Sequence, residues 1–179
     1  METNDLECCP EFNVEKWDQK TVVWENKKFI RETIPTFFHI PFYPMIGKKM
    51  MKLHTAALKS EATIPDKLDG LVLFRDPTPF RSELYYAVTQ EVEGAENLSL
   101  SGTYAARVFD GPYNSVPKHV KEMEKELHEK GKKAKEYYIH YAYCPKCAKK
   151  FGHNYMILFY YMIWKKSWNV FMKRLFQVN

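Results

Sequence analysis

The chain has 179 residues, 45% of them hydrophobic and 27% charged, with a formal net charge of +5. This length and composition exclude a disordered chain and favour one domain that buries its own core. The first 15 residues hold acids and no apolar run, so we expect no secretory signal and a cytoplasmic location. The longest apolar run, 155–164, is too short to cross a bilayer, which needs about 20 residues.

Residues 1–34 are predicted to form an N-terminal arm that packs on the core. Apolar side chains recur in it between charged ones, namely Phe12, Trp17, Val22, Val23, Trp24, Phe29 and Ile30. The segment is too short and too rich in Trp, Pro and charge for a helical DNA-binding domain, and no recognition-helix motif accompanies it. We therefore expect no nucleic-acid partner in spite of the positive net charge.

A domain over 35–164 follows, and its first unit spans 35–92. A short strand is expected at 37–40, stopped by prolines, and a helix over about 45–60. The helix is indicated by apolar residues at helical spacing, Ile46, Met50, Leu53 and Ala57. Two strands are then expected, at 71–74 and 83–88.

The second unit, 101–164, repeats the same order of elements. A strand at 103–109 ends at a Gly-Pro turn, and a helix over 116–130 is predicted between Ser115 as N-cap and Gly131 as the residue after the C-cap. Strands at 136–143 and 154–164 complete the unit. The sequence thus predicts an α+β fold of two β-α-β-β units of the SHS2 type, related by a pseudo-twofold axis. Its antiparallel sheet should carry both helices on one side, with a ligand groove between the units.

Two short motifs in the second unit point to a family. Gly102-Thr103-Tyr104 and Gly111-Pro112-Tyr113, followed by the helix and then Tyr137-Tyr138-Ile139, resemble the gyrase-inhibitor-like (GyrI-like) small-molecule-binding domains. The resemblance covers roughly 35–164. It implies a groove lined by aromatic side chains that takes up flat, often cationic or hydrophobic compounds.

Further stretches resemble stand-alone bacterial members of this type, many loosely labelled hydrolase. They are Cys8 to Phe12, Trp17-Asp18, Lys27 to Ile30, Ser101 to Thr103 and Cys144 to Cys147. Some relatives hydrolyse cyclopropane-bearing natural products with a glutamate and a tyrosine. The resemblance therefore implies binding of small hydrophobic, planar or cationic molecules, as a sensor or scavenger. The alternative is a hydrolase of reactive or xenobiotic small molecules, for which no nucleophile motif is present.

Glu83 is the expected carboxylate of the groove. The family commonly has a glutamate near the start of the last strand, which this chain lacks, and pseudo-symmetry places Glu83 in the equivalent strand of the first unit. An unpaired carboxylate there would favour a cationic ligand, whereas a solvated strand end is the structural alternative. If the protein is an enzyme, Glu83 and Tyr138 are the candidate catalytic residues. The candidate ligand-binding residues are His39, Glu83, Tyr85, Tyr113, Tyr138, His140 and Tyr160.

The four cysteines form two pairs, Cys8-Cys9 and Cys144-x-x-Cys147. The second spacing lets both sulfurs face one ion, and Cys8 and Cys9 are candidates to complete a zinc site. Adjacent cysteines point in different directions in an extended chain, so thiols with a packing role and a redox function stay open as alternatives. No cofactor is required for binding, and zinc is the candidate metal.

Residues 165–179 form a basic, aromatic tail. Trp168, Leu175 and an apolar residue between them recur at helical spacing among lysines and an arginine. A helix docked on its own domain is expected, and an interaction protein that uses this tail is the third functional class. The sequence leaves the oligomeric state open.

Overall fold

The computed structural model describes residues 9–164, so the predicted tail and Cys8 lie outside the described residues. The described elements, in chain order, are α1 (Val14–Trp17), β1 (Lys20–Phe37), β2 (Ile40–Pro41), α2 (Tyr43–Lys59), β3 (Val72–Thr78), β4 (Arg81–Ala87), β5 (Glu96–Asp110), a 3-10 turn (Tyr113–Ser115), α3 (Val116–Glu129), β6 (Lys132–Tyr141), α4 (Pro145–Phe151) and β7 (Tyr155–Trp164). The order β-α-β-β occurs twice, as predicted, with α2 and α3 as the long helices.

Six strands close into an antiparallel barrel. Their order is β1-β4-β3-β6-β7-β5, and β5 pairs back with β1 to complete the ring, while β2 pairs only with the end of β1. Strand β1 is long enough to pair with β4 of the first unit over 29–35 and with β5 of the second unit over 20–31. Because alternate side chains of a strand point to opposite faces, each strand contributes one set to the barrel interior and one to the outside.

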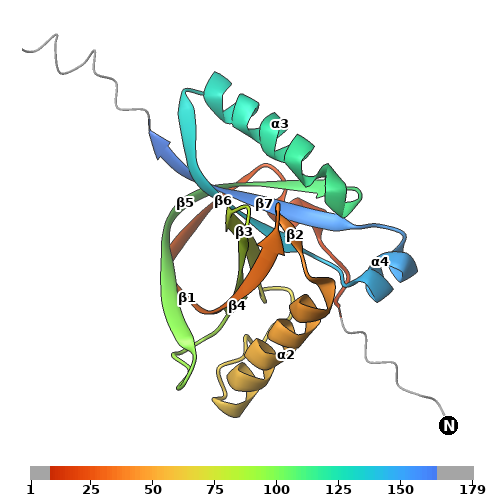
Figure 1. Ribbon diagram of the computed structural model, residues 1–179. Coiled ribbons are helices and arrows are strands. Elements are labelled where there is room, and N and C mark those ends of the chain that lie inside the picture. The colour runs from red at the N-terminus through yellow and green to blue at the C-terminus, as the bar shows by residue number, and fades with distance from the viewer. Residues whose placement is uncertain (1–8, 165–179) are drawn as a thin grey trace, which may run out of the picture.

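Both long helices cover the outer face, one on each unit (Figure 1). Helix α2 packs Leu53 and Ala57 against Ile30 and Leu84, which point outward from β1 and β4. Helix α3 packs Met123 and Leu127 on the outward face of β6 and β7. The α+β class, the antiparallel sheet and the position of the helices on one side of it are therefore confirmed.

The barrel interior is a third core and is mainly aromatic. Its buried members are Trp24, Phe29, Leu71, Leu73, Tyr85, Ala87, Tyr104, Ala106, Tyr138, Ile157 and Phe159. Trp24 contacts both Tyr104 and Phe159, at 4.3 Å and 5.2 Å between ring centroids. Side chains thus fill most of the space between the two units, as in other small barrels.

The N-terminal part of the fold differs from the expectation. The strand predicted at 37–40 is wrong, because β1 ends at Phe37, and Phe38 and His39 form the turn into β2 with φ of 48° and 66°. Residues 20–34, expected within an arm, form most of β1. This strand has a neighbour on each side, β4 and β5, and a bulge between Trp24 and Lys27. Its mixture of charged and apolar residues therefore belongs to a strand of the barrel and not to an arm.

The start and end of α3 follow the predicted signals. Ser115 occupies the N-cap position, with Pro117 in the first turn, but its side chain makes no capping bond to the helix and its hydroxyl instead donates to the carbonyl of Pro112 at 2.7 Å. Lys130 is the C-cap and Gly131 follows with φ of 69°, a left-handed conformation that glycine adopts without strain. The helix therefore places its apolar face on the sheet where the sequence predicts it.

Candidate functional site

A buried carboxylate lies inside the barrel at the end nearest the β3–β4 turn. Glu83 points inward from β4, and its side chain is only 3% exposed. It accepts a hydrogen bond from the Tyr85 hydroxyl at 2.6 Å and from Arg75 Nη1 at 3.1 Å. Arg31 and Arg81 each approach its other oxygen at 3.3 Å. Three guanidinium groups thus surround one carboxylate.

The ionisation of Glu83 follows from these partners. Burial alone would raise the pKa of the carboxyl group, but the hydrogen bonds from Tyr85 and Arg75 and the positive charges nearby lower it below its ordinary value. The carboxylate is therefore charged and already paired. The expectation of an unpaired carboxylate that waits for a cationic ligand is wrong for Glu83, because arginines from β1 and β3 occupy that role.

Arg31 and Arg75 also form ion pairs with carboxylates at the rim of the barrel. Arg31 pairs with Glu96 of β5 as well as with Glu83, and Arg75 Nη2 lies 3.0 Å from Glu136 of β6. The side chains of Arg31 and Arg75 are 30% and 29% exposed, so both reach from the buried carboxylate to solvent. Strands from both units meet in this one cluster.

Tyrosine rings line the interior beside the network. Tyr138 lies edge-on to Tyr85 at 5.5 Å and to Tyr104 at 6.2 Å between ring centroids. Burial raises the pKa of Tyr104 to about 12 and raises the pKa of Tyr138 further in the same direction. Neither Tyr104 nor Tyr138 donates a hydrogen bond from its hydroxyl group to any of the described residues. These hydroxyls remain neutral donors for a bound molecule.

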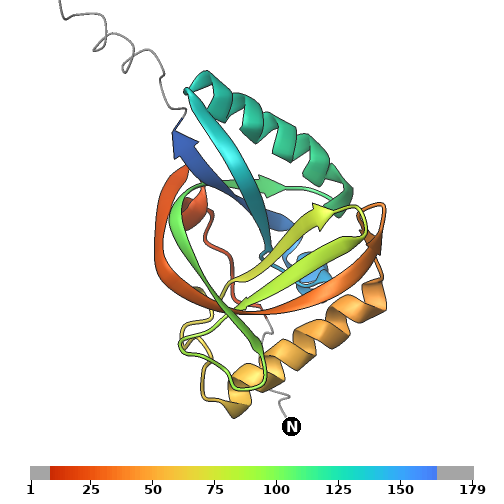
Figure 2. The same ribbon diagram turned by 60° about the vertical axis from the view of Figure 1, so that its left-hand side comes forward.

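A cavity of about 230 Å³ lies where β3 of the first unit and β6 of the second diverge. The two strands pair only at Leu73 with His140 and at Phe74 with Ile139, and Figure 2 shows them separating beyond that point. The cavity is lined by Arg75, Asp76, Pro77, Glu124, Lys135, Glu136, Tyr137 and Tyr160. Arg75 and Glu136 belong both to this lining and to the Glu83 network. The groove predicted between the units thus corresponds in position to an opening between β3 and β6.

Tyr137 lines this cavity together with carboxylates, and the buried ring of Tyr160 lies against it. Tyr137 and Tyr160 stack with ring centroids 5.6 Å apart and planes 24° from parallel. Burial raises the pKa of Tyr137, and the negative charges of Asp76 and Glu124 raise it further. The lining holds three carboxylates against two cations, Arg75 and Lys135.

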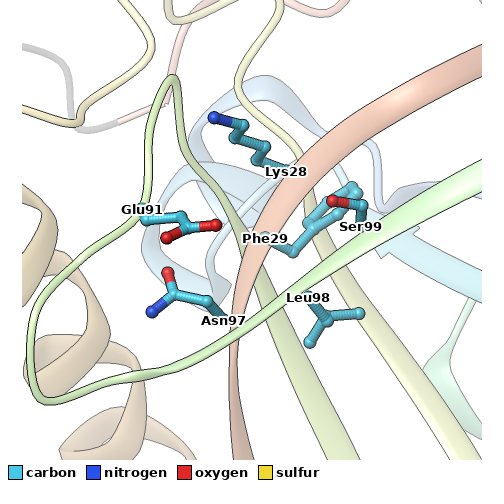
Figure 3. Close-up of a pocket in the computed structure, with 6 residues that line it drawn as sticks. All are labelled: Lys28, Phe29, Glu91, Asn97, Leu98 and Ser99. Atoms are coloured by element: carbon cyan, nitrogen blue, oxygen red, sulfur yellow. The ribbon is translucent and has the colours of Figure 1, made fainter.

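A second hollow of similar volume lies on the other side of the barrel, over β1 and β5 (Figure 3). Its lining includes Lys28, Glu91 and Asn97. The Asn97 amide is committed to the loop before β5, since it accepts from Val92 N and donates to the carbonyls of Val92 and Ala95. This hollow has no aromatic wall other than the ring of Phe29, which belongs to the interior core. We therefore take the β3–β6 cavity as the candidate site.

The candidate residues from the sequence divide into two groups. Glu83, Tyr85 and Tyr138 lie together in the barrel interior, and His140 shares the inward face of β6 with Tyr138. Burial lowers the pKa of His140 to about 4, and its Nδ1 lies 3.0 Å from the carbonyl oxygen of Val72, so this histidine is neutral and held by the backbone of β3.

The other three candidates lie on the outside. His39 is exposed in the β1–β2 turn, with Nδ1 4.0 Å from Asp76. Tyr113 is exposed beside α3, where its ring contacts Tyr141. Tyr160 points outward from β7 beneath α3, donates to the carbonyl of Val120 at 3.0 Å and lines the β3–β6 cavity.

Sequence reasoning missed the arginines and Tyr137. Arg31 lies among several other charged residues of β1, and Arg75 of β3 is followed by Asp76, so neither arginine stands out in the sequence. A charge on the inward face of a strand signals a buried network, but that face is known only once the strands pair. The sequence shows Tyr137 only as one of several tyrosines on β6. Its place in the cavity lining depends on α3 and β3, which pack around it only in the folded protein.

The cysteines come together at the other end of β6. Cys9, Cys144 and Cys147 place their sulfur atoms within 4.8 Å of one another. The N–H of Cys144 donates to the sulfur of Cys9 at 3.4 Å, although the two residues are far apart in the sequence. Two of the three belong to the predicted Cys-x-x-Cys pair.

Comparison with known proteins supports the fold and gives a family. A family model described as "Bacterial hydrolase" matches residues 1–162. None of the curated proteins matches the chain in sequence. In the part of the chain that the structure describes, no helix combines the length and apolar character needed to cross a membrane.

Several solved structures share the fold. The EcmrR C-terminal domain superposes with a TM-score of 0.64 at 11% identity, over 82% of this chain and 96% of that domain. An uncharacterized conserved protein from Listeria innocua superposes with a TM-score of 0.59 at 9% identity, over 86% of this chain and all of that one. A hydrolase from the same organism superposes with a TM-score of 0.56 at 9% identity, also over 86% of this chain and all of that one. At these identities the likeness is one of fold.

Proposed function

Because this chain belongs to the bacterial hydrolase family, we propose that it acts on small organic molecules and that its primary event is the binding of a planar cation in the β3–β6 cavity. One observation carries the proposal. The ring of Tyr137 lines the cavity with the buried ring of Tyr160 stacked against it, and the carboxylates of Asp76, Glu124 and Glu136 line the same cavity.

The physical basis is the attraction of a cation to aromatic faces and to carboxylates. A positively charged ring that lies on a tyrosine face gains about 0.5 to 2 kcal/mol, more where water is excluded. Glu124 has no ion pair with the described residues, so it is available to a ligand, whereas Glu83 is not. The volume of about 230 Å³ suits a compact molecule of two or three fused rings.

A titration with two matched dyes tests this. Proflavine is a planar cation and acridine is a ring system of the same shape that is neutral at neutral pH. We expect proflavine to bind more tightly than acridine by about tenfold, and Tyr137→Leu to weaken proflavine binding by a similar factor, the value of a well-placed cation–π contact. Fluorescence titration measures each dissociation constant.

The charge contribution is tested on α3. Glu124→Gln should weaken proflavine about two- to fivefold, the range for an ion pair open to solvent, and leave acridine unchanged. Glu129→Gln removes the same charge from the same helix outside the cavity and is the control. Equal affinity of the two dyes for the wild-type protein would contradict the proposal.

Hydrolysis of a small molecule that reaches the barrel interior, beyond the β3–β6 cavity, is the second candidate, and the family description favours it. Glu83 would act as general base on water and the unengaged Tyr138 hydroxyl would donate a hydrogen bond to the developing oxyanion. We rank binding first because the arginines lower the basicity of Glu83. Turnover of 2-naphthyl acetate that is lost in both Glu83→Gln and Tyr138→Phe would reverse this order.

A further inference from the structure

Three cysteines from distant parts of the chain form a compact cluster of sulfur atoms. Cys9 precedes α1, Cys144 follows β6 as the N-cap of α4, and Cys147 lies within α4. All three sulfurs lie within 4.8 Å of one another. Thiolates that bind one tetrahedral zinc ion at about 2.3 Å are about 3.8 Å apart. The three sulfurs therefore stand close to the spacing that a single ion requires.

The surroundings are those of a built site. Cys147 is only 5% exposed, and Cys9 and Cys144 are partly buried. The bond from Cys144 N–H to the Cys9 sulfur is a backbone donor to a ligand atom, which favours the thiolate and orients it. Proline after Cys144 and two residues between the pair give the Cys-x-x-Cys turn that directs both sulfurs to one point.

We propose that Cys9, Cys144 and Cys147 bind a zinc ion that fastens the N-terminal segment to the β6–α4 connection. Zinc uses all three sulfurs, whereas a disulfide uses two and leaves a third beside it, so the three-sulfur cluster favours the metal. Thiolate ligands in tetrahedral geometry select zinc among the common divalent ions. No residue of this cluster lines the β3–β6 cavity, so the proposal is independent of the ligand proposed there.

The contacts next to the cluster show what the ion would hold in place. Phe12 N donates to the hydroxyl of Tyr143 at 2.9 Å, and the ring of Phe12 packs on Tyr155 at 5.4 Å. Only this short segment joins Cys9 to α1 and to the start of β1. A metal at the cluster therefore anchors the strand that closes the barrel, and its binding energy adds to the stability of the fold.

Metal analysis tests the proposal on the full chain, purified without a metal-affinity step. We expect about one zinc per chain by mass spectrometry, which Cys144→Ser and Cys147→Ser both lose. Lys149→Ser, an exposed change in the same helix, retains it. Chelation of the zinc lowers the Tm of the wild-type protein by about 5 °C or more.

Absorption spectroscopy with cobalt is a second test, which needs no variant. Addition of Co²⁺ to the chelated wild-type protein should produce the sulfur-to-cobalt charge-transfer band and the visible bands of a tetrahedral site, saturating at about one equivalent. Zinc below about a tenth of an equivalent together with no cobalt band overturns the proposal. A disulfide between two of the three cysteines, found in non-reduced peptides, overturns it as well.

Discussion

At the scale of single residues, Glu83 shows how a charge is kept inside an aromatic barrel. A buried carboxylate without partners costs several kcal/mol, so it requires donors for both oxygens. Tyr85 and Arg75 supply them at one oxygen and Arg31 and Arg81 at the other. Since Arg31 and Arg75 also pair with rim carboxylates, the cluster as a whole is close to neutral.

Removal of the Glu83 charge should therefore destabilise the protein. Glu83→Gln keeps the shape but leaves two partly buried guanidinium groups without their common partner. We expect a loss of about 1 to 3 kcal/mol in the free energy of unfolding, less than for a fully buried pair because water reaches both arginines. Urea denaturation measures it. Glu96 also pairs with Arg31 but is 53% exposed, so Glu96→Gln should cost under about 1 kcal/mol in unfolding free energy. If the two variants lost equal stability, burial would not be the cause.

His140 gives the protein a dependence on mildly acidic pH. Burial lowers its pKa from the ordinary 6.5 to about 4. Between these values the unfolded chain binds a proton at this residue and the folded chain does not. The stabilising contribution is therefore complete above pH 6.5 and is lost as the pH falls toward 4.

His140→Gln tests that dependence, since the amide retains a hydrogen-bonding group opposite Val72. We expect the free energy of unfolding of the wild type to fall between about pH 6.5 and pH 5 and that of the variant to change much less. Carboxylates with lowered pKa values, such as Glu83, act mainly at lower pH. Parallel curves for the two proteins over this interval would show that His140 does not cause the loss.

At the scale of elements, β5 and β7 approach closely through a glycine. Gly102 of β5 has φ of 141°, and a Cβ atom placed on it would lie 2.3 Å from Cε2 of Tyr161 on β7. The Tyr161 ring occupies that space and packs on Tyr104 at 5.3 Å between centroids. The absent side chain thus lets an aromatic ring close the interior next to the Glu83 network.

Gly102→Ala should therefore destabilise the barrel. Backbone strain and the clash with Tyr161 together should cost about 1 to 3 kcal/mol in unfolding free energy. In a Tyr161→Ala background the cost should be smaller, because the clash is gone and only the strain remains. Gly47→Ala is the control, since nothing lies within 4 Å of its Cβ position in α2, and it should be neutral or stabilising by up to about 1 kcal/mol. Additive effects at 102 and 161 would contradict the packing account.

At the scale of the whole molecule, the site arises where the two units meet. Strand β3 belongs to the first unit and β6 to the second, and they pair at only two positions before they diverge. The cavity and the arginine network both use residues from the two units, whereas Tyr137 and Tyr160 both come from the second. Barrel closure by β1 holds this geometry, because β1 pairs with a strand of each unit.

The sequence by itself determined the repeated β-α-β-β order, the two helices with their ends, and the antiparallel α+β class. These features depend on local signals, namely apolar residues at helical spacing, Ser115 and Gly131 at the ends of α3, and the turn at Gly111 and Pro112. The symmetry between the units also predicts that Glu83 points into the space between them.

Only the tertiary structure decided what surrounds Glu83, that β1 completes a barrel, and that Cys9 lies beside Cys144. Each depends on contacts between residues far apart in the chain, on which local periodicity carries no information. Arg31 is the clearest example, since its position on an inward face of β1 has meaning only once β4 pairs beside it. Periodicity determines which face of an element is apolar, whereas pairing and closure determine which side chains share the enclosed space.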